Sequence, residues 1–264
     1  MTRHERLSSA LQPRDQVGAP HRPLPGYQVD GESREQFVRR LFNRTAASYD
    51  RLNAAFSLGT GQRYRRRALL SAGLKPGDRV LDVAVGTGLV AREACFITGQ
   101  PRNVIGLDVS EGMLAQARRQ LSIGLVQARA EAIPLGDATV DFVSIGYALR
   151  HVSDLERVFS EFLRVLKPGG RLLIMEITAP GNRMGENMLK IYLGHVVPWL
   201  SRMLHARHER TLMQYYWDTI EACVPPDAIL GALKAVGFIS VSCQTELSIF
   251  RAYLGQRKPD EISK

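Results

Sequence analysis

The sequence contains little cysteine and no long apolar run. Among its 264 residues are three cysteines, Cys95, Cys223 and Cys243, whose wide spacing provides neither a CxxC metal site nor a disulfide framework. No stretch approaches the roughly 18 consecutive apolar residues of a membrane span. The polar start of the chain lacks the apolar core of a signal peptide. We therefore expect a cytoplasmic protein of a reducing compartment, without a bound metal.

Aromatic residues are also scarce, at 7%, whereas 35 basic residues outnumber 26 acidic ones and give a formal net charge of +9. A basic protein suits an anionic ligand, a nucleic acid or an anionic membrane surface. The basic clusters carry no aromatic residues spaced for stacking on bases, which disfavours nucleic acid. Part of the excess charge lies in Arg63, Arg65, Arg66 and Arg67 on one predicted helix, and we expect these arginines to form a solvated helix face.

The chain divides into an arm, one domain and a short tail. Residues 1–33 hold four prolines and almost no periodic apolar pattern, which predicts a disordered N-terminal arm. A helical pattern begins at Arg34, and a second one runs through Arg63 to Ala72. Strand-like runs then alternate with helix-length segments, at 79–83, 104–108, 124–128, 142–146 and 170–177. This alternation predicts one α/β domain over residues 34–258 with a parallel sheet, followed by a tail at 259–264.

Residues 181–222 form a long insertion before a predicted C-terminal hairpin. The insertion is rich in aromatic residues and methionine and has cationic flanks. Such a composition suits a helical lid over a long apolar acceptor, or a contact with a membrane surface. An amphipathic lid that only covers the sheet fits the same pattern.

The first chemical signal is the segment 80–88, a strand that runs into a turn of small residues before a helix. Small residues let the backbone approach a ligand closely. Asp82 and the free amides at the helix start can hold an amino-acid-like or phosphate group. Asp108 ends the next strand, where a carboxylate can accept both hydroxyls of a ribose; a helix cap is its alternative role. Because position 91 is alanine and Leu89 and Val90 crowd the turn, a dinucleotide pyrophosphate would fit poorly.

Two further segments carry a family resemblance. The run Arg-Val-Leu-Lys-Pro-Gly-Gly-Arg-Leu-Leu-Ile-Met-Glu at 164–176 is close to a signature of the family that C-methylates the ring of ubiquinone and menaquinone precursors. The run Tyr-Asp-Arg-Leu-Asn at 49–53 resembles the family's other signature, although Gly61 and Tyr64 stand where the family has histidine and tryptophan. Over about residues 37–238 the chain therefore resembles a class I S-adenosyl-L-methionine-dependent methyltransferase.

This resemblance implies a doubly wound, Rossmann-like α/β fold, with the seven-stranded methyltransferase sheet and an added helical lid. It also implies S-adenosyl-L-methionine as the cofactor. The residues implied in its binding are Asp82, Ala84, Gly86 and Gly88 around the methionine part, Asp108 on the ribose and Met113 beside the adenine. Arg129 replaces the family's small polar adenine acceptor, so the adenine is expected to be read by the backbone near Ala130 or by Glu131.

The segment 146–152 resembles the substrate-side loop of the same family. Methylation of a quinol ring carbon needs an ionised ring hydroxyl, which Arg150 could stabilise, while His151 or a water beside it takes the proton. The structural alternatives are that Arg150 pairs with Asp154 on a turn and that His151 caps the next helix. We therefore expect methylation of an apolar quinol or similar phenolic acceptor, by an enzyme that acts alone or as a homodimer and contacts the inner membrane surface peripherally.

Other functions stay open on the sequence alone. The altered residues at 61 and 64 favour a changed acceptor, such as a secondary-metabolite phenol, an amine or a lipid. A quinone-modifying relative can use the donor for another reaction, as in rhodoquinone-forming amination. A binding protein without catalysis would keep the same fold. Nucleic acid is disfavoured as a substrate because Ser-Ile-Gly-Tyr at 144–147 stands where such enzymes carry an Asn-Pro-Pro-Tyr-like motif.

Overall fold

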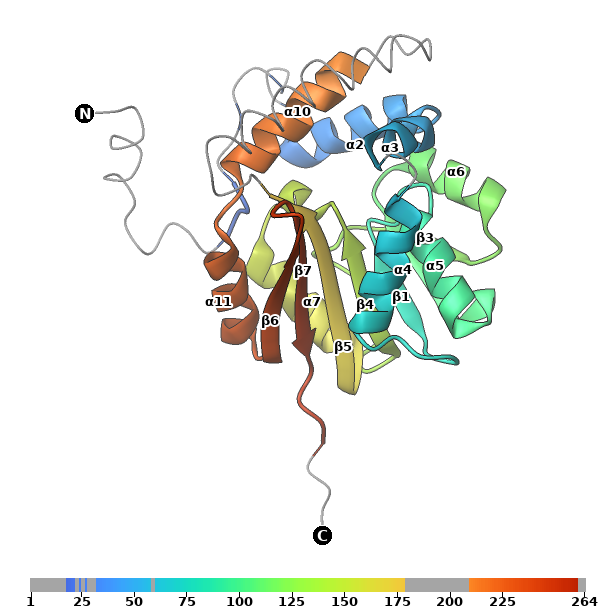
Figure 1. Cartoon of the computed structure of the whole chain (residues 1–264), viewed down its shortest axis with the longest axis vertical. Coiled ribbons are helices and arrows are strands. Elements are labelled where there is room, and N and C mark those ends of the chain that lie inside the picture. Colours follow the sequence, from blue (N-terminus) through green and yellow to red (C-terminus); the bar gives the residue numbers. More distant parts are fainter. Residues whose placement is uncertain are drawn as a thin grey trace, which may run out of the picture.

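A seven-stranded sheet forms the centre of the protein (Figure 1). The computed structural model describes residues 18–21, 24, 27, 32–57, 60–178 and 209–260. Its strands are β1 (Val80–Val83), β2 (Val104–Asp108), β3 (Gly124–Gln127), β4 (Val140–Gly146), β5 (Leu166–Ile177), β6 (Ile239–Glu246) and β7 (Phe250–Gln256). The spatial order is β3-β2-β1-β4-β5-β7-β6. Neighbours from β3 to β5 are parallel, and β7 runs antiparallel to β5 and β6. The predicted doubly wound α/β fold is confirmed.

Helices cover both faces of this sheet and one of its ends. They are α2 (Arg34–Thr45), α3 (Tyr49–Ser57), α4 (Gly61–Ser71), α5 (Leu89–Thr98), α6 (Glu111–Gln120), α7 (Leu155–Val165), α10 (Glu209–Ala222) and α11 (Pro226–Val236), with short 3-10 turns at Pro101–Asn103 and Leu149–His151. One buried cluster joins the sheet to α7 and α11, and another joins it to α4 and α5. Because both faces are covered, all four residues of β1 are buried.

A third cluster lies away from the sheet faces. Phe37, Val38 and Leu41 of α2 pack against Leu212 and Tyr215 of α10. Figure 1 shows α2, α3 and α10 together across one end of the sheet. This layer includes the part of the predicted lid at 209–222, which forms α10, while residues 179–208 lie outside the described residues.

The described part of the N-terminal segment contacts the domain. The carbonyl oxygen of Gly18 accepts a hydrogen bond from the backbone amide of Leu155, and that of Pro20 accepts one from Val224. His21 is buried. Residues 18–21 are thus bound to the first residue of α7 and to the segment between α10 and α11, while residues 1–17 lie outside the described residues. Within the described ranges, no helix is both long and apolar enough to cross a bilayer.

The arginine cluster on α4 does not form the solvated face that we expected. Arg65 is only 6% exposed, on the same side of the helix as the buried Ala68 and Leu69. Positions three and four residues apart share one face of a helix, so Arg65 points inward with them. Arg63 is exposed, and Arg66 pairs with Glu93 at 2.7 Å. The expectation was therefore wrong for Arg65.

Candidate active site

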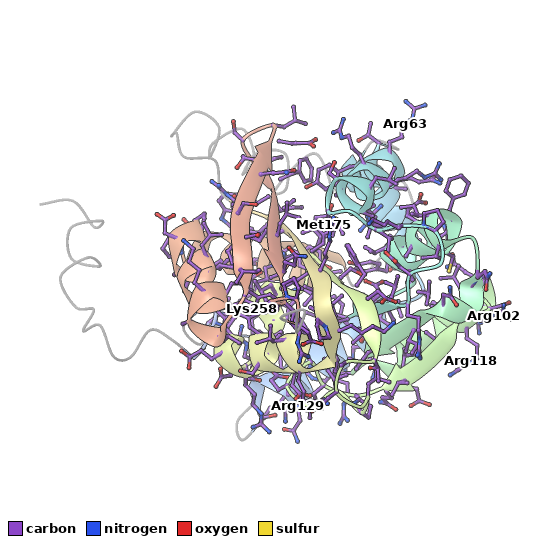
Figure 2. The ribbon with its side chains drawn as sticks, turned by 90° about the horizontal axis from the view of Figure 1, so that it is seen from below. Arg63, Arg102, Arg118, Arg129, Met175 and Lys258 are labelled. Atoms are coloured by element: carbon purple, nitrogen blue, oxygen red, sulfur yellow. The ribbon has the colours of Figure 1, made fainter. Side chains whose placement is uncertain are left out.

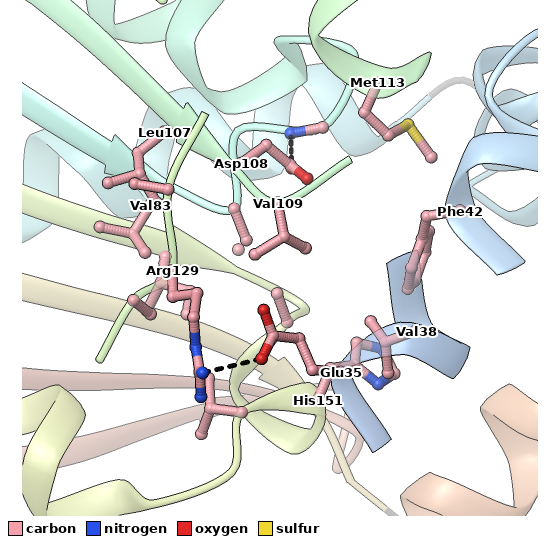
Figure 3. Close-up of a pocket in the computed structure, with 18 of the residues that line it drawn as sticks. Glu35, Val38, Phe42, Val83, Leu107, Asp108, Val109, Met113, Arg129 and His151 are labelled. Carbon is pink, nitrogen blue, oxygen red and sulfur yellow. Dashed lines mark hydrogen bonds and ion pairs between the residues drawn. The ribbon is translucent and has the colours of Figure 1, made fainter. Parts of the chain in front are cut away.

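A cavity that is open to solvent and has about 820 Å³ of empty space, part of it at the opening, lies at the carboxyl ends of the parallel strands. Its wall comes from the loops after β1, β2, β3 and β4, with Val38 and Phe42 of α2 on the opposite side (Figure 3). The sheet order reverses between β1 and β4, and ligands bind at such switch points in open α/β sheets. This cavity is called the donor cavity after the role proposed for it below. The predicted site residues that line it are Ala84, Gly86, Asp108, Met113, Ala130, Glu131 and His151.

The glycine turn leaves space for a ligand. Gly86 has a φ of +56°, and a Cβ there would meet no atom nearer than the Ala84 carbonyl oxygen, at 4.0 Å. At Gly88, with a φ of +92°, a Cβ would lie 2.5 Å from the Leu121 side chain. Gly86 thus borders open volume, whereas Gly88 allows a close packing contact and does not line the cavity.

Asp82 lies beneath this turn and is 1% exposed. One carboxylate oxygen accepts a hydrogen bond from Ser144 at 2.6 Å, and the other has no partner among the described residues. Burial raises the pKa of Asp82 to about 7, against the opposing effect of the Ser144 bond. Asp82 does not line the donor cavity, but its unpartnered oxygen is a buried acceptor near the turn.

The Asp108 carboxylate is held in place by two backbone amides. Its Oδ2 accepts from Gly86 and its Oδ1 from Ser110, both at 2.8 Å. Burial raises the pKa of Asp108 to about 6, although these hydrogen bonds oppose the shift. The cap of α6 is Ser110, whose hydroxyl accepts from the Met113 amide at 3.1 Å. Because each Asp108 oxygen keeps a free lone pair, the carboxylate can accept two ligand hydroxyls.

The rim of the donor cavity carries an ion pair. Arg129 contacts Glu35 of α2 at 2.8 Å (Figure 3), and lies 3.6 Å from Glu131. The other oxygen of Glu131 accepts from the Ser153 amide at 2.7 Å. Arg129 thus connects α2 to the loop after β3, and Glu131 connects that loop to the one after β4.

Arg150 forms an ion pair with Glu176, not with Asp154. The Arg150 and Glu176 side chains are each 3% exposed and lie 2.5 Å apart. The second oxygen of Glu176 accepts from the Leu149 amide at 2.7 Å. Asp154 instead caps α7. The last residue of the 164–176 signature therefore fixes the loop that carries Arg150.

His151 is half-buried, and its ring is neutral at neutral pH. Its ring is stacked on Tyr215, with Nδ1 3.2 Å from the tyrosine hydroxyl, and it does not cap α7. Burial and the nearby charge of Arg150 hold the pKa of His151 well below its ordinary value. Its Nε2 has no hydrogen-bond partner among the described residues, and the residue lines the donor cavity. A neutral imidazole with a free nitrogen can accept a proton.

A second cavity, also open to solvent and with about 1420 Å³ of empty space, part of it at the opening, lies beside the first. Its wall comes from α3, α4, α10 and the β6–β7 hairpin, and includes Arg65, Arg150 and Tyr216. Tyr49 and Tyr147 line both cavities, which therefore meet at these two rings. Gly61 and Tyr64, the two departures from the family signature, lie on the wall of this second cavity, which is called the acceptor cavity after the role proposed for it below.

The doubly wound sheet, the small-residue turn and the carboxylate at the end of β2 define a class I S-adenosyl-L-methionine-dependent methyltransferase. Residues 30–248 match the sequence profile of the ubiE/COQ5 methyltransferase family. The chain is 39% identical over 232 residues to a demethylmenaquinone methyltransferase of Symbiobacterium thermophilum, a match that covers 83% of this chain and 92% of the relative. The protein therefore belongs to the ubiE/COQ5 methyltransferase family.

A second curated relative agrees with this assignment, and a solved structure shares the fold. The ubiquinone/menaquinone biosynthesis C-methyltransferase UbiE of Shewanella sediminis is 31% identical over 224 residues, which are 82% of this chain and 88% of that protein. A methyltransferase structure from Thermotoga maritima, described as a possible histamine N-methyltransferase, shares the fold with a TM-score of 0.59. It is 19% identical, and the alignment covers 83% of this chain and 99% of that one.

Sequence reasoning missed several residues of the site. Tyr49 and Tyr147 at the junction of the cavities were not proposed, nor was Arg65. The Asp50 carboxylate accepts hydrogen bonds from Thr87 of the glycine turn, at 2.5 Å, and from Gln120 of α6, at 2.8 Å. Asp50 belongs to the signature at 49–53, which could have indicated a role for it beside the donor.

Proposed function

We propose that this methyltransferase transfers a methyl group to a ring carbon of a reduced quinone, in the biosynthesis of a menaquinone- or ubiquinone-type cofactor. The observation that supports this proposal is the pair of cavities that meet at Tyr49 and Tyr147. One has the polar groups suited to a nucleoside. The other is larger, and its wall combines aromatic and apolar side chains with four arginines, Arg63, Arg65, Arg67 and Arg150. The names of the curated relatives point to the same acceptor class.

The residues of the donor cavity fit S-adenosyl-L-methionine, which supplies an electrophilic methyl group on a sulfonium. We propose that Asp108 accepts the two ribose hydroxyls, because both of its oxygens are oriented by backbone amides and keep a free lone pair. The space at Gly86 and the unpartnered oxygen of Asp82 suit the methionine part. Met113 is assigned to the adenine ring, and the Ala130 backbone or Glu131 to its edge. The role of Gly88 is to allow the turn to pack.

The transfer needs an electron-rich ring carbon. Loss of a proton from a ring hydroxyl places negative charge on the carbon ortho or para to it. That carbon forms the new bond to the methyl group as the methyl–sulfur bond breaks, and its electron pair stays on sulfur. Loss of the ring hydrogen as a proton then restores aromaticity, and the ring oxygen takes up a proton again to regenerate the hydroxyl. The sum releases one proton for each methyl group transferred.

Arg150 and His151 are our candidates for the proton and charge steps. Arg150 lines the acceptor cavity, while His151 lines the donor cavity and has an unpartnered Nε2. Because the charge of Arg150 is balanced by Glu176, we assign Arg150 to positioning the ring oxygen through a hydrogen bond. The neutral His151, or a water beside it, can take up the proton.

We also propose that the acceptor reaches its cavity from a membrane surface. The β6–β7 turn carries Leu247, which is 83% exposed and lines the acceptor cavity beside the exposed Arg63 and Arg67. An apolar side chain among cationic ones suits an anionic bilayer surface. Peripheral contact there would let a polyprenyl chain stay in the lipid while its ring enters the protein.

The functional test is complementation of a bacterial strain that lacks its own family member. The proposal predicts that expression of this protein converts the accumulated demethylated quinone into the methylated one, seen by mass spectrometry of the lipid extract. An aminated quinone would instead favour the rhodoquinone alternative. An unchanged quinone pool with folded protein present would contradict the proposal.

A further inference from the structure

Arg65 is a buried cation on the wall of the acceptor cavity, next to Tyr147, one of the two residues at which the cavities meet. The mechanism above does not use it. We propose that Arg65 binds the ionised ring oxygen of the acceptor and supplies the positive charge that stabilises it. The inference rests on the proposed function, because it assigns a residue to the acceptor site of that reaction. It concerns the charge of the bound ring, and it applies to any phenolic acceptor that reacts as its anion.

The position of Arg65 supports this role. Its guanidinium donates a hydrogen bond to the Asn53 side chain at 2.5 Å and lies 5.7 Å from the centre of the Tyr147 ring. All three residues line the acceptor cavity, and Tyr147 also lines the donor cavity. Arg65 therefore stands where the acceptor ring must approach the methyl group.

The charge of Arg65 is also not balanced by a direct partner. Among the described residues no carboxylate forms an ion pair with it, and its Nε has no hydrogen-bond partner. The neighbouring cations of the cavity differ, because Arg150 is paired with Glu176 and Arg67 with Glu246. A buried, unpaired charge is costly, and natural proteins keep such groups mainly where they act on a ligand.

Hydrogen-bond capacity agrees with the electrostatics. A guanidinium has five N–H donors, and only the bond to Asn53 uses one of them among the described residues. A phenolate oxygen accepts such donors more strongly than a neutral hydroxyl does. Arg65 would thus favour the ionised acceptor, whereas Arg150 would orient the ring without adding net charge to the cavity.

The experiment compares an anionic ligand with a neutral one of nearly the same shape. The probes are 2-hydroxy-1,4-naphthoquinone, which is ionised at neutral pH, and its methyl ether, which is not. Each is titrated by calorimetry into the full chain saturated with S-adenosylhomocysteine. We expect the wild type to bind the anionic probe more tightly than the ether, by about 10- to 100-fold, the range of one charged hydrogen bond.

Arg65→Gln should remove this preference, because it should lower the affinity for the anionic probe while changing the affinity for the ether by less than about 3-fold. Arg65→Lys keeps the charge and should recover part of the preference. The matched control is Arg118→Gln, which removes the same charge from an exposed side chain at the edge of the molecule (Figure 2) and should change neither affinity. With the natural acceptor, Arg65→Gln should lower kcat while the affinity for S-adenosylhomocysteine stays constant.

Each other result overturns the inference. If the wild type binds both probes equally well, no uncompensated cation lies at the ring oxygen. This comparison uses only the wild-type protein and so does not depend on whether a variant folds. A preference that persists in Arg65→Gln assigns the charge to another group. Equal weakening of both probes leaves Arg65 with only the role of positioning Asn53 and Tyr147. A wild type that binds neither probe removes the quinone-type acceptor as well, and so contradicts the proposed function separately.

Discussion

Replacing Asp108 by alanine should abolish donor binding without destabilising the protein. The carboxylate can accept two charged hydrogen bonds from the ribose hydroxyls, each worth about 1.5–3 kcal/mol. Their loss should weaken the binding of S-adenosylhomocysteine by roughly 10²- to 10⁴-fold. The substitution also removes the free-energy cost of keeping a carboxylate buried and ionised, and this gain offsets the hydrogen bonds that the folded protein loses. Its pKa is raised from 3.8 to about 6 by burial, and a shift of about two pH units corresponds to about 3 kcal/mol.

The sign of the pH dependence follows from this shift. A carboxyl group with a raised pKa in the folded protein stabilises the unliganded fold most fully below pH 3.8, and this contribution is lost as the pH rises through about 6. Asp108→Ala removes that cost but leaves the Gly86 and Ser110 amides without their acceptor. At neutral pH we therefore expect the unliganded variant to have an unfolding free energy within about 2 kcal/mol of the wild type.

Donor affinity has the opposite pH dependence, because the ribose hydroxyls need the ionised carboxylate. Affinity in the wild type should begin to fall below about pH 7, where Asp82 takes up a proton. It should fall further below about pH 6, where Asp108 does, with each group contributing up to about tenfold per pH unit. Calorimetry across this range, with thermal unfolding of each variant, measures both effects. The control is Asp137→Ala, whose side chain is 75% exposed. Unchanged affinity in a folded Asp108→Ala variant would refute the ribose assignment.

The remaining predictions concern the turn, the ion pair and the contact of α3 with the turn. Gly86→Val should lose affinity for S-adenosylhomocysteine, whereas Gly77→Val, at a position with a φ of +85° and equally open surroundings, should keep it. Both variants should lose about 1–2 kcal/mol of stability because valine is strained at a positive φ. Equal affinities of the two variants would show that no ligand lies at Gly86. Arg150→Gln leaves Glu176 buried and without its ion-pair partner, and should lower the free energy of unfolding in urea by about 3–5 kcal/mol. Adding Glu176→Gln should restore most of this loss. No recovery in the double variant would show that the two side chains are not coupled. Asp50→Asn should speed dissociation of S-adenosylhomocysteine in stopped-flow measurements by about 5-fold, the value of one weakened hydrogen bond, and an unchanged rate would exclude a role of this contact in retaining the donor.

The fold and the donor cavity could be predicted because their signals are local in sequence. Asp108 ends a strand, and the glycine turn follows the neighbouring strand. Parallel neighbours end at the same edge of a sheet, so placing the strands also placed these groups together. The structure adds that Gly86 donates directly to Asp108, at 2.8 Å.

The partner of Arg150 could not be found in this way. The nearby Asp154 was the partner suggested by sequence spacing, but the pairing of β4 with β5 decides the contact. Gly146 lies opposite Met175 in that register, so the next residue, Glu176, stands beside the loop that carries Arg150. This contact spans 26 positions and depends on the sheet, not on local pattern.

For Arg65 the local signal was present but was outweighed. Arg65 shares a helix face with Ala68 and Leu69, a spacing that indicates burial. The count of four arginines in five residues favoured a solvated face instead. The charges alone gave no reason to expect one of these arginines to be buried. In the structure Arg65 lines the second cavity, where we propose that it binds the acceptor.

The most direct test of the central claim is the product of the purified enzyme. The full chain is incubated with S-adenosylmethionine carrying a ¹³C-labelled methyl group and a chemically reduced 2-prenyl-1,4-naphthoquinone, and the product is examined by carbon NMR. We predict a labelled methyl signal in the range of an aryl C–CH₃ group. A signal in the methoxy range, or no labelled product from enzyme that binds both ligands, would contradict ring-carbon methylation.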